Sequence, residues 1–300
     1  MTKKILIAVL ILIGLFVLSY ASSKLININD ARDKIAVIPI TGVITIDGGG
    51  IGFESQGASS TDIVQFIQEA NKNPNVKGII LEINSPGGSA VASKEIADAV
   101  KNSKKPVVSW IREVGASGAY WISSSSKLIA ADPLSITGSI GVTGSYLEFS
   151  DLFEKYGVTY ERLVSGKYKD TGSPYKELTE EEKRLLQDKI NQIHSVFVDE
   201  VASNRKLNRN QVEKLATGEF YLGKEAYDLG LVDYLGGKDL AINLTKQLAG
   251  IKEAELIRYE KKRGIFDIVG GLSAKNFYYM GKGIGSEIKT SSYEIPVRLE

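Results

Sequence analysis

Apolar runs alternate with amphipathic stretches between Thr61 and Ser117, and this alternation restricts the fold more than any other feature of the chain. Residues 76–83 are an apolar run of the length of one buried strand, residues 90–100 have helical spacing, and a second apolar run begins at Val107. Strands that alternate with short helices pair in parallel, because each helix carries the chain back to the start of the next strand. We therefore predict an α/β fold, with a mostly parallel sheet flanked by helices.

The alternation continues toward the C-terminus. Residues 127–131 and 158–164 are predicted strands, residues 147–156 a short helix, and residues 179–206 a long helix that opens with a capping-box pattern. Residues 34–46, upstream, predict one or two further strands.

The N-terminal segment is strongly apolar. Residues 5–21 carry no charge and follow Lys3 and Lys4. As a helix this run would reach roughly 25 Å, close to the ~30 Å of a bilayer core, which predicts a membrane-targeting segment. Small residues at Ser19 and Ala21 leave cleavage open, although the length favours an uncleaved anchor. The two lysines would stay cytoplasmic, so we expect a single-pass protein of the cell membrane with an extracytoplasmic bulk.

Composition excludes several classes of function. The chain has 37 Lys and Arg against 36 Asp and Glu in 300 residues, a net charge of +1 that argues against nucleic acid as a partner. The absence of cysteine excludes thiol catalysis and Cys-ligated zinc. The single histidine, His194, has apolar neighbours at helical spacing and is interpreted as a helix-flank residue. We expect no metal or cofactor, and any serine nucleophile needs a base other than histidine.

One hydroxyl occupies a bend of small residues after the strand that begins at Val107. Ser117 lies between Ala116 and Gly118, where a predicted strand turns into a helix. At such a turn the hydroxyl can be exposed beside unpaired amides of the helix start, which are the donors that an oxyanion needs. The alternative is an ordinary N-cap serine.

A second turn follows the preceding strand. The sequence NSPGGS, residues 84–89, contains Pro86, Gly87 and Gly88, which permit a tight turn and a close approach to the main chain. Such a turn can present an amide at the carboxyl edge of the sheet, although an ordinary strand-to-helix turn is also consistent with it.

A third segment, VSGKYKDTGSP at residues 164–174, carries Lys167 and Lys169 on either side of a tyrosine. Such lysines are usually solvated. A lysine base must be neutral, and since the ordinary lysine pKa lies well above neutral pH, catalysis would require burial of one of them.

Four motifs, GASGAYWIS, NSPGGS, TGSIGV and SGKYKD, resemble those of the signal peptide peptidase A family of Ser/Lys proteases. The order in which the chain carries them is NSPGGS, GASGAYWIS, TGSIGV and SGKYKD, behind the apolar N-terminus, and the likeness spans roughly residues 34–248. The resemblance implies the Clp protease and crotonase fold, with repeated strand-strand-helix units, and assembly into a homo-oligomeric ring.

The resemblance also implies roles for individual residues. Ser117 would be the nucleophile and Lys169 the general base, with Lys167 at a variable position of the motif. The amides of Gly88, or alternatively Gly87, and of Gly118 would form the oxyanion hole. Ser139 would orient the lysine.

Substrates of such an enzyme should bind as extended strands, because backbone pairing accepts any sequence. We expect a serine endopeptidase that cleaves hydrophobic, signal-peptide-like segments. The residues expected to contact the peptide are Ile136, Gly138, Ile140 and Val142.

Three other functions remain open on the sequence. An acyl-CoA hydratase-like enzyme could use the same fold, but it would rely on carboxylates and needs no export segment. A membrane-tethered scaffold would keep the ring without the chemistry, and a narrower membrane protease would cleave a single partner.

The predicted organisation has three parts. Residues 1–27 form the anchor or signal segment and residues 28–250 the protease domain. Residues 251–300 form a tail for the membrane surface, a neighbouring subunit or the active site.

Overall fold

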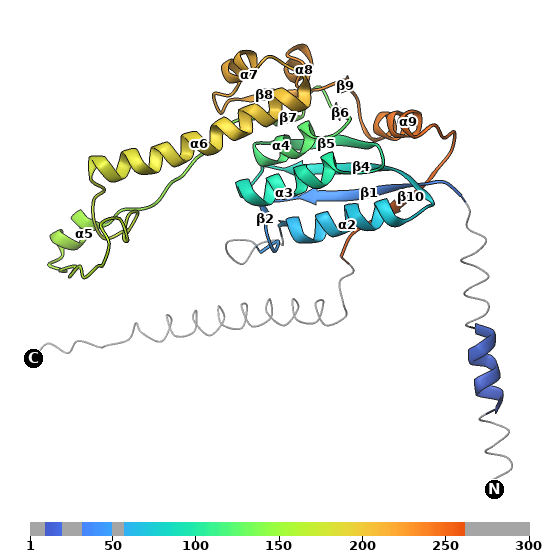
Figure 1. Ribbon diagram of the computed structural model, residues 1–300, viewed down its shortest axis with the longest axis horizontal. Coiled ribbons are helices and arrows are strands. Elements are labelled where there is room, and N and C mark those ends of the chain that lie inside the picture. Colours follow the sequence, from blue (N-terminus) through green and yellow to red (C-terminus); the bar gives the residue numbers. More distant parts are fainter. Residues whose placement is uncertain (1–9, 20–31, 50–56, 262–300) are drawn as a thin grey trace, which may run out of the picture. The chain divides into compact units, whose positions relative to one another are not determined.

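A single mixed sheet forms the centre of the molecule, as the computed structural model shows for residues 10–19, 32–49 and 57–261 (Figure 1). Its eight strands are β1 (Lys34–Thr41), β4 (Val76–Ser85), β5 (Val107–Ala116), β6 (Leu128–Ala131), β7 (Ile136–Gly138), β8 (Phe220–Leu222), β9 (Tyr234–Leu235) and β10 (Glu255–Arg258). Two short strands, β2 (Ile44–Thr45) and β3 (Ala58–Ser59), pair separately.

The strand order is β10-β1-β4-β5-β6-β9, and every pair along it is parallel. β7 continues beside the end of β5, also in parallel, and pairs on its other side with β8, the only antiparallel partner among the described strands. The predicted mostly parallel sheet is therefore confirmed. Because all these strands run the same way, the turns that follow β4 and β5 lie at one edge of the sheet.

Helices cover both faces of the sheet. The described helices with assigned bounds are α2 (Ser60–Lys72), α3 (Ala90–Lys101), α4 (Gly118–Ser124), α5 (Ser150–Lys155), α6 (Glu180–Arg205), α7 (Arg209–Leu215), α8 (Gly223–Asp228) and α9 (Lys238–Ala249). Ile38 and Leu81 belong to a core shared with α2 and α3. Val108 packs with Ala241 and Leu244 of α9, on the opposite face.

The long helix α6 begins as the sequence predicts. The Thr179 hydroxyl accepts a hydrogen bond from the Glu182 amide at 3.2 Å, and the Glu182 carboxylate accepts one from the Thr179 amide at 3.0 Å. This capping box satisfies two amides that a helix start leaves unpaired. At its other end α6 contributes Phe197, which stacks on Trp121 of α4 with ring centroids 4.6 Å apart.

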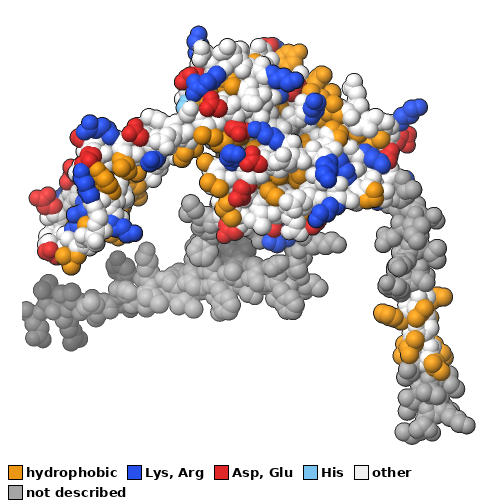
Figure 2. All heavy atoms as spheres, viewed as in Figure 1, with side chains coloured by type: hydrophobic (Ala, Val, Ile, Leu, Met, Phe, Trp, Pro, Cys, Tyr) orange, Lys and Arg blue, Asp and Glu red, His pale blue; other side chains and the backbone are white. Residues whose placement is uncertain are grey.

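Residues 144–177, which make up most of the segment between β7 and α6, are called the arm below. Most of its side chains are exposed, and apolar ones lie between charged ones at its surface (Figure 2). The predicted strand at 158–164 is wrong: these residues form no strand, and Leu163 is 95% exposed. Their apolar side chains lie at the surface, and no strand of the described chain pairs with them.

The two ends of the chain are described only in part. Residues 10–19 are helical, and no helix within the described ranges is both long and apolar enough to cross a membrane. The rest of the predicted anchor, residues 1–9 and 20–27, lies outside the described residues. β10, within the predicted tail, is an edge strand beside β1, and residues 262–300 are again outside the described part.

We expect Phe197→Ala to lower the free energy of unfolding by about 3–5 kcal/mol, because it removes a side chain that is 1% exposed and stacked on Trp121. Val196→Ala, one residue away but 43% exposed, should cost less than about 1 kcal/mol. Equilibrium unfolding in denaturant measures both. Equal losses would mean that α6 is not held to α4 by this stack.

Candidate active site

Ser117 occupies a strained backbone conformation between β5 and α4. Its φ is 53° and its ψ −123°, in a region that residues with a Cβ seldom adopt. The turn is held by its amide, which donates to the Gly138 carbonyl at 2.9 Å. A strained strand-to-helix turn of this kind is the arrangement that presents a nucleophilic serine at the end of a sheet.

Two backbone amides beside Ser117 are free. Within the described ranges, neither the Gly88 nor the Gly118 amide has an acceptor. The two lie close together, since a Cβ built on Gly118 would be 3.3 Å from the Gly88 nitrogen. The Gly87 amide is already bonded to the Ser85 hydroxyl at 3.1 Å. Of the two glycines in the turn, Gly88 is therefore the one that can serve an oxyanion.

The first residue of β2, Ile44, fixes this glycine turn. The Ile44 amide donates to the Gly87 carbonyl at 2.9 Å, and the Ile44 carbonyl accepts from the Ser89 amide at 2.8 Å. The approach is so close that a Cβ on Gly88 would lie 2.1 Å from the Ile44 oxygen, and Gly87 has a φ of 101°. Both positions therefore require glycine: at 88 there is no space for a Cβ, and at 87 the backbone angle is one that other residues seldom adopt.

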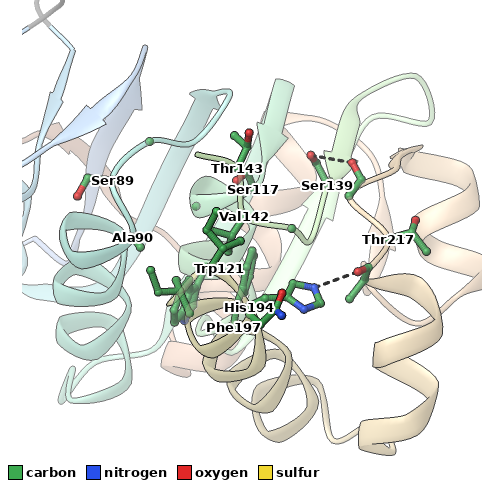
Figure 3. A pocket seen from close by; sticks show the side chains of 18 of the residues that line it. Ser89, Ala90, Ser117, Trp121, Ser139, Val142, Thr143, His194, Phe197 and Thr217 are labelled. Carbon is green, nitrogen blue, oxygen red and sulfur yellow. Dashed lines mark hydrogen bonds between the residues drawn. The ribbon is translucent and has the colours of Figure 1, made fainter. Parts of the chain in front are cut away.

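A cavity of about 720 Å³ opens beside the nucleophile (Figure 3). Ser117, Gly88 and Gly118 line it together with one face of α6. Trp121 and Phe197 form part of its apolar wall. Among the described residues no Asp, Glu, Lys or Arg lines this cavity. The site can hold an uncharged, extended chain beside the nucleophile, and no cluster of described His, Asp or Glu could hold a metal.

Ser139 also lines the cavity, but its hydroxyl is engaged elsewhere. It donates to the Gly218 carbonyl at 3.2 Å, as the dashed line in Figure 3 shows, and its amide donates to the Glu219 carbonyl at 2.8 Å. Its φ of 48° follows the positive φ of Gly138. These bonds fix the backbone next to Gly138, whose carbonyl accepts the hydrogen bond from the Ser117 amide.

Lys169 does not line the cavity. It belongs to the arm, several of whose polar side chains contact the first turn of α6. Lys167 donates a hydrogen bond to the Glu181 carboxylate at 2.7 Å, and this bond raises the lysine pKa. Lys169 itself pairs with no acidic group among the described residues. Within one chain, therefore, the predicted base and nucleophile are not brought together.

Two carboxylates hold the arm, Asp170 by a bond within it and Glu182 by bonds from it to α6. Asp170 is bonded to Arg162, and this hydrogen bond holds the Asp170 pKa at about 2. Glu182 accepts from Lys176 at 2.7 Å, which together with the Thr179 amide lowers its pKa to about 2. Both acids have depressed pKa values, so these pairs persist down to acidic pH and hold the segment around Lys169 in place.

The predicted substrate contacts are placed differently from one another. Val142 lines the cavity, whereas Ile136, Gly138 and Ile140 do not. β7 is paired with β5 on one side and β8 on the other, so Ile136 and Gly138 lie in a strand without a free edge. The Ile140 side chain is fully buried. β8 thus occupies the edge of β7 that the sequence analysis assigned to the substrate. An extended peptide would instead have to pair with the chain from Gly141 onward.

The α6 wall of the cavity was not found by sequence reasoning. Gln187, Ile190, Asn191 and His194 line it from one helix face. Their spacing of three and four residues was visible, but it does not distinguish a cavity wall from a face that packs on the core. The one other indication in the sequence was that His194 is the single histidine of the chain.

The geometry is that of a serine peptidase on a parallel α/β sheet: a strained serine, two free amides and a cavity for an extended chain. Residues 99–252 match peptidase family S49. The chain is 37% identical over 263 residues to a putative protease of Methanocaldococcus jannaschii, with 85% of this chain and 82% of that one covered. This chain belongs to peptidase family S49.

A second relative is a putative signal peptide peptidase SppA of Enterococcus faecium, 35% identical over 233 residues, which are 77% of this chain and 68% of the relative. Among solved structures, the fold is similar to that of 1510-N, a membrane-bound stomatin-specific protease determined in complex with a substrate peptide. The TM-score is 0.51 at 17% identity, with 82% of this chain and 99% of that one covered. This likeness concerns the fold.

We expect Ser117→Gly to be more stable than Ser117→Ala by about 1 kcal/mol, because only glycine relieves the strain of a φ of 53°. At an unstrained position the order is the reverse, since glycine loses more backbone entropy on folding. Thermal or denaturant unfolding of the two variants decides. A less stable glycine variant would show that the turn carries no strain.

Proposed function

We propose that this S49 peptidase is an endopeptidase with a Ser117/Lys169 dyad that cleaves extended hydrophobic segments, such as released signal peptides, at the membrane surface. The observation that carries the proposal is the strained Ser117 beside two free amides in a cavity without charged side chains. The sheet on which the site is built is consistent with Clp-protease-like repeated units, and residues 28–250 are the proposed protease domain.

The reaction follows from these groups. Neutral Lys169 Nζ takes the proton of the Ser117 hydroxyl as Oγ forms a bond to the peptide carbonyl carbon. The amides of Gly88 and Gly118 hold the oxyanion, each stabilising the transition state by about 3 to 4 kcal/mol. The lysine ammonium then gives its proton to the leaving nitrogen as the C–N bond breaks. Water, deprotonated by the same lysine, releases the acyl group and Ser117 regains its proton.

The surroundings of the two lysines favour Lys169 over Lys167 as the base. Lys167 is held by Glu181, which raises its pKa and keeps it protonated. Lys169 has no acidic partner among the described residues, so burial in an uncharged cavity would drive it toward the neutral form that a base requires.

Lys169 must then reach a cavity that it does not line in its own chain. We infer that it enters the cavity of a neighbouring copy in a homo-oligomer. The arm supports this: it exposes apolar side chains that a monomer gains nothing from exposing, among them Leu147 at 72%, Tyr156 at 72% and Leu163 at 95%. The anchoring of Asp170 and Glu182 holds the arm ready for such a contact.

The proposed substrates follow from the cavity and the N-terminus. A wall that includes Trp121, Ile190 and Phe197 without a charged group suits apolar side chains. The apolar residues 5–21 would tether the domain to the membrane, with the catalytic domain outside the cytoplasm, where released signal peptides and membrane segments are found. A protease restricted to one membrane protein would use the same site.

Two other functions are less favoured. An acyl-CoA hydratase-like site would need carboxylates beside the oxyanion hole, and among the described residues none lines this cavity. A scaffold would have no use for a strained serine, since that conformation costs stability without serving assembly.

Ser117→Ala and Lys169→Ala should each lower peptide hydrolysis by at least about 1,000-fold, whereas Lys167→Ala should stay within about threefold of the wild type.

The wild-type rate should rise with pH, because a lysine base acts only when deprotonated. Fluorogenic peptides measure this, and those with apolar flanks should be cleaved at least about tenfold faster than those with charged flanks. Loss of activity in Lys167→Ala but not in Lys169→Ala would contradict the assignment.

Co-expression of Ser117→Ala with Lys169→Ala, each under its own affinity tag, should restore activity to about one quarter of the wild-type level in complexes that carry both tags. Each variant alone is inactive, but a mixed ring contains interfaces at which an intact serine meets an intact lysine. Double-tag purification followed by peptide hydrolysis makes the measurement. Complexes that assemble and stay inactive would mean that each dyad is completed within one chain.

A further inference from the structure

His194 lies in the wall of the proposed substrate cavity, on α6, half-buried and close to Phe197 and Trp121 (Figure 3). Its Nε2 is 3.0 Å from the Ala216 carbonyl oxygen. A carbonyl only accepts, so Nε2 carries a proton in both charge states of the ring. Nδ1 has no partner among the described residues and is the nitrogen that gains or loses the second proton.

No charged side chain of the described chain lines this cavity beside His194. On α6, Asp188 and Lys189 lie outside the lining. α7 packs against α6 and brings Arg209, Glu213 and Lys214, none of which lines the cavity, and Arg209 is bonded to Glu213 and to Asp199.

The remaining neighbours of the ring carry no titratable group into the cavity. α4, the chain at residues 139–143 and the chain at residues 216–218 contribute only uncharged lining residues. Imidazole is the side chain that ordinarily changes charge between about pH 5 and pH 8. Among the described residues that line the cavity, His194 is therefore the one whose side chain can carry a positive charge.

The same wall holds a second unused polar group. Trp121 lines the cavity and is 3% exposed, yet its indole N–H has no acceptor among the described residues. Leaving such a buried donor unpaired costs free energy. Gln187 and Asn191 also line this wall, so together with the free nitrogen of His194 it can bind a polar side chain.

We propose that His194 is a specificity-determining residue that makes the side-chain preference of the cavity depend on pH. With the ring neutral, the cavity takes uncharged side chains; with the ring protonated, it takes a carboxylate side chain, as of Glu or Asp, near the scissile bond. The inference rests on the proposed function, because it assigns a substrate preference to the cavity beside Ser117.

The effect is expected in a ratio of rates. A hydrogen bond from a charged donor to a carboxylate is about twice as strong as one between neutral groups, so protonation should favour Glu over Gln by about tenfold. Because both peptides are cleaved by the same dyad, the slowing of the base at low pH cancels in the ratio.

The first experiment is a competition between paired peptides in one reaction with the full chain in detergent. The pairs differ only by Gln or Glu at one of the positions flanking the scissile bond, and cleavage is followed by mass spectrometry at about pH 5.5 and about pH 8. In the wild type, the Glu to Gln ratio should rise about tenfold toward the lower pH at one position. In His194→Gln, which retains a donor for the Ala216 carbonyl, the ratio should not change with pH.

A second measurement does not need turnover. His194 is the single histidine of the chain, so a Ser117→Ala protein without a histidine tag gives one imidazole signal in an NMR titration. Binding of the Glu peptide should move the midpoint of that titration to higher pH, and the Gln peptide should not. A pH-independent ratio in an active enzyme, or identical midpoints with both bound peptides, would overturn the role of His194. Absence of hydrolysis with a peptide-dependent midpoint would instead overturn the proposed function.

Discussion

The strained conformation of Ser117 is the constraint on which the rest of the site depends. A serine with a φ of 53° persists only if its surroundings determine it more strongly than its own preference does. The bond from its amide to the Gly138 carbonyl supplies part of that, and β7 is itself paired on both sides, with β5 and β8. The sheet thus holds the nucleophile by backbone bonds, and within the described chain its hydroxyl and the neighbouring amides of Gly88 and Gly118 have no hydrogen-bond partner.

One helix joins the cavity to the arm. The stacking of Phe197 on Trp121 holds the C-terminal half of α6 against α4, directly behind Ser117. The N-terminal end of the same helix holds the arm through Glu181 and Glu182. A change in the position of α6 would therefore alter both the substrate cavity and the presentation of Lys169, so in the proposed oligomer substrate binding and supply of the base are mechanically linked.

Sequence reasoning succeeded where the determining interactions are local. The parallel sheet, the glycine turn at Gly88, the turn at Ser117 and the capping box at Thr179 follow from neighbouring residues, and the structure contains all four elements. It failed where a distant segment decides. Nothing near β7 indicates that β8, some eighty residues later, takes its free edge. At 158–164 an apolar pattern suggested a strand, because such a pattern alone does not show whether the residues pair in a sheet or lie exposed.

The separation of Lys169 from Ser117 within one chain has a physical rationale. To become neutral, the lysine must be desolvated. A chain that buried it permanently would be less stable by the free energy of that desolvation. A lysine held on an exposed arm remains solvated until a cavity of low polarity receives it. If a neighbouring copy provides that cavity, burial of the apolar arm residues offsets the desolvation of the lysine, and the base becomes active only in the assembled enzyme. An isolated chain would then present the strained Ser117 without a base and would not cleave the proteins around it.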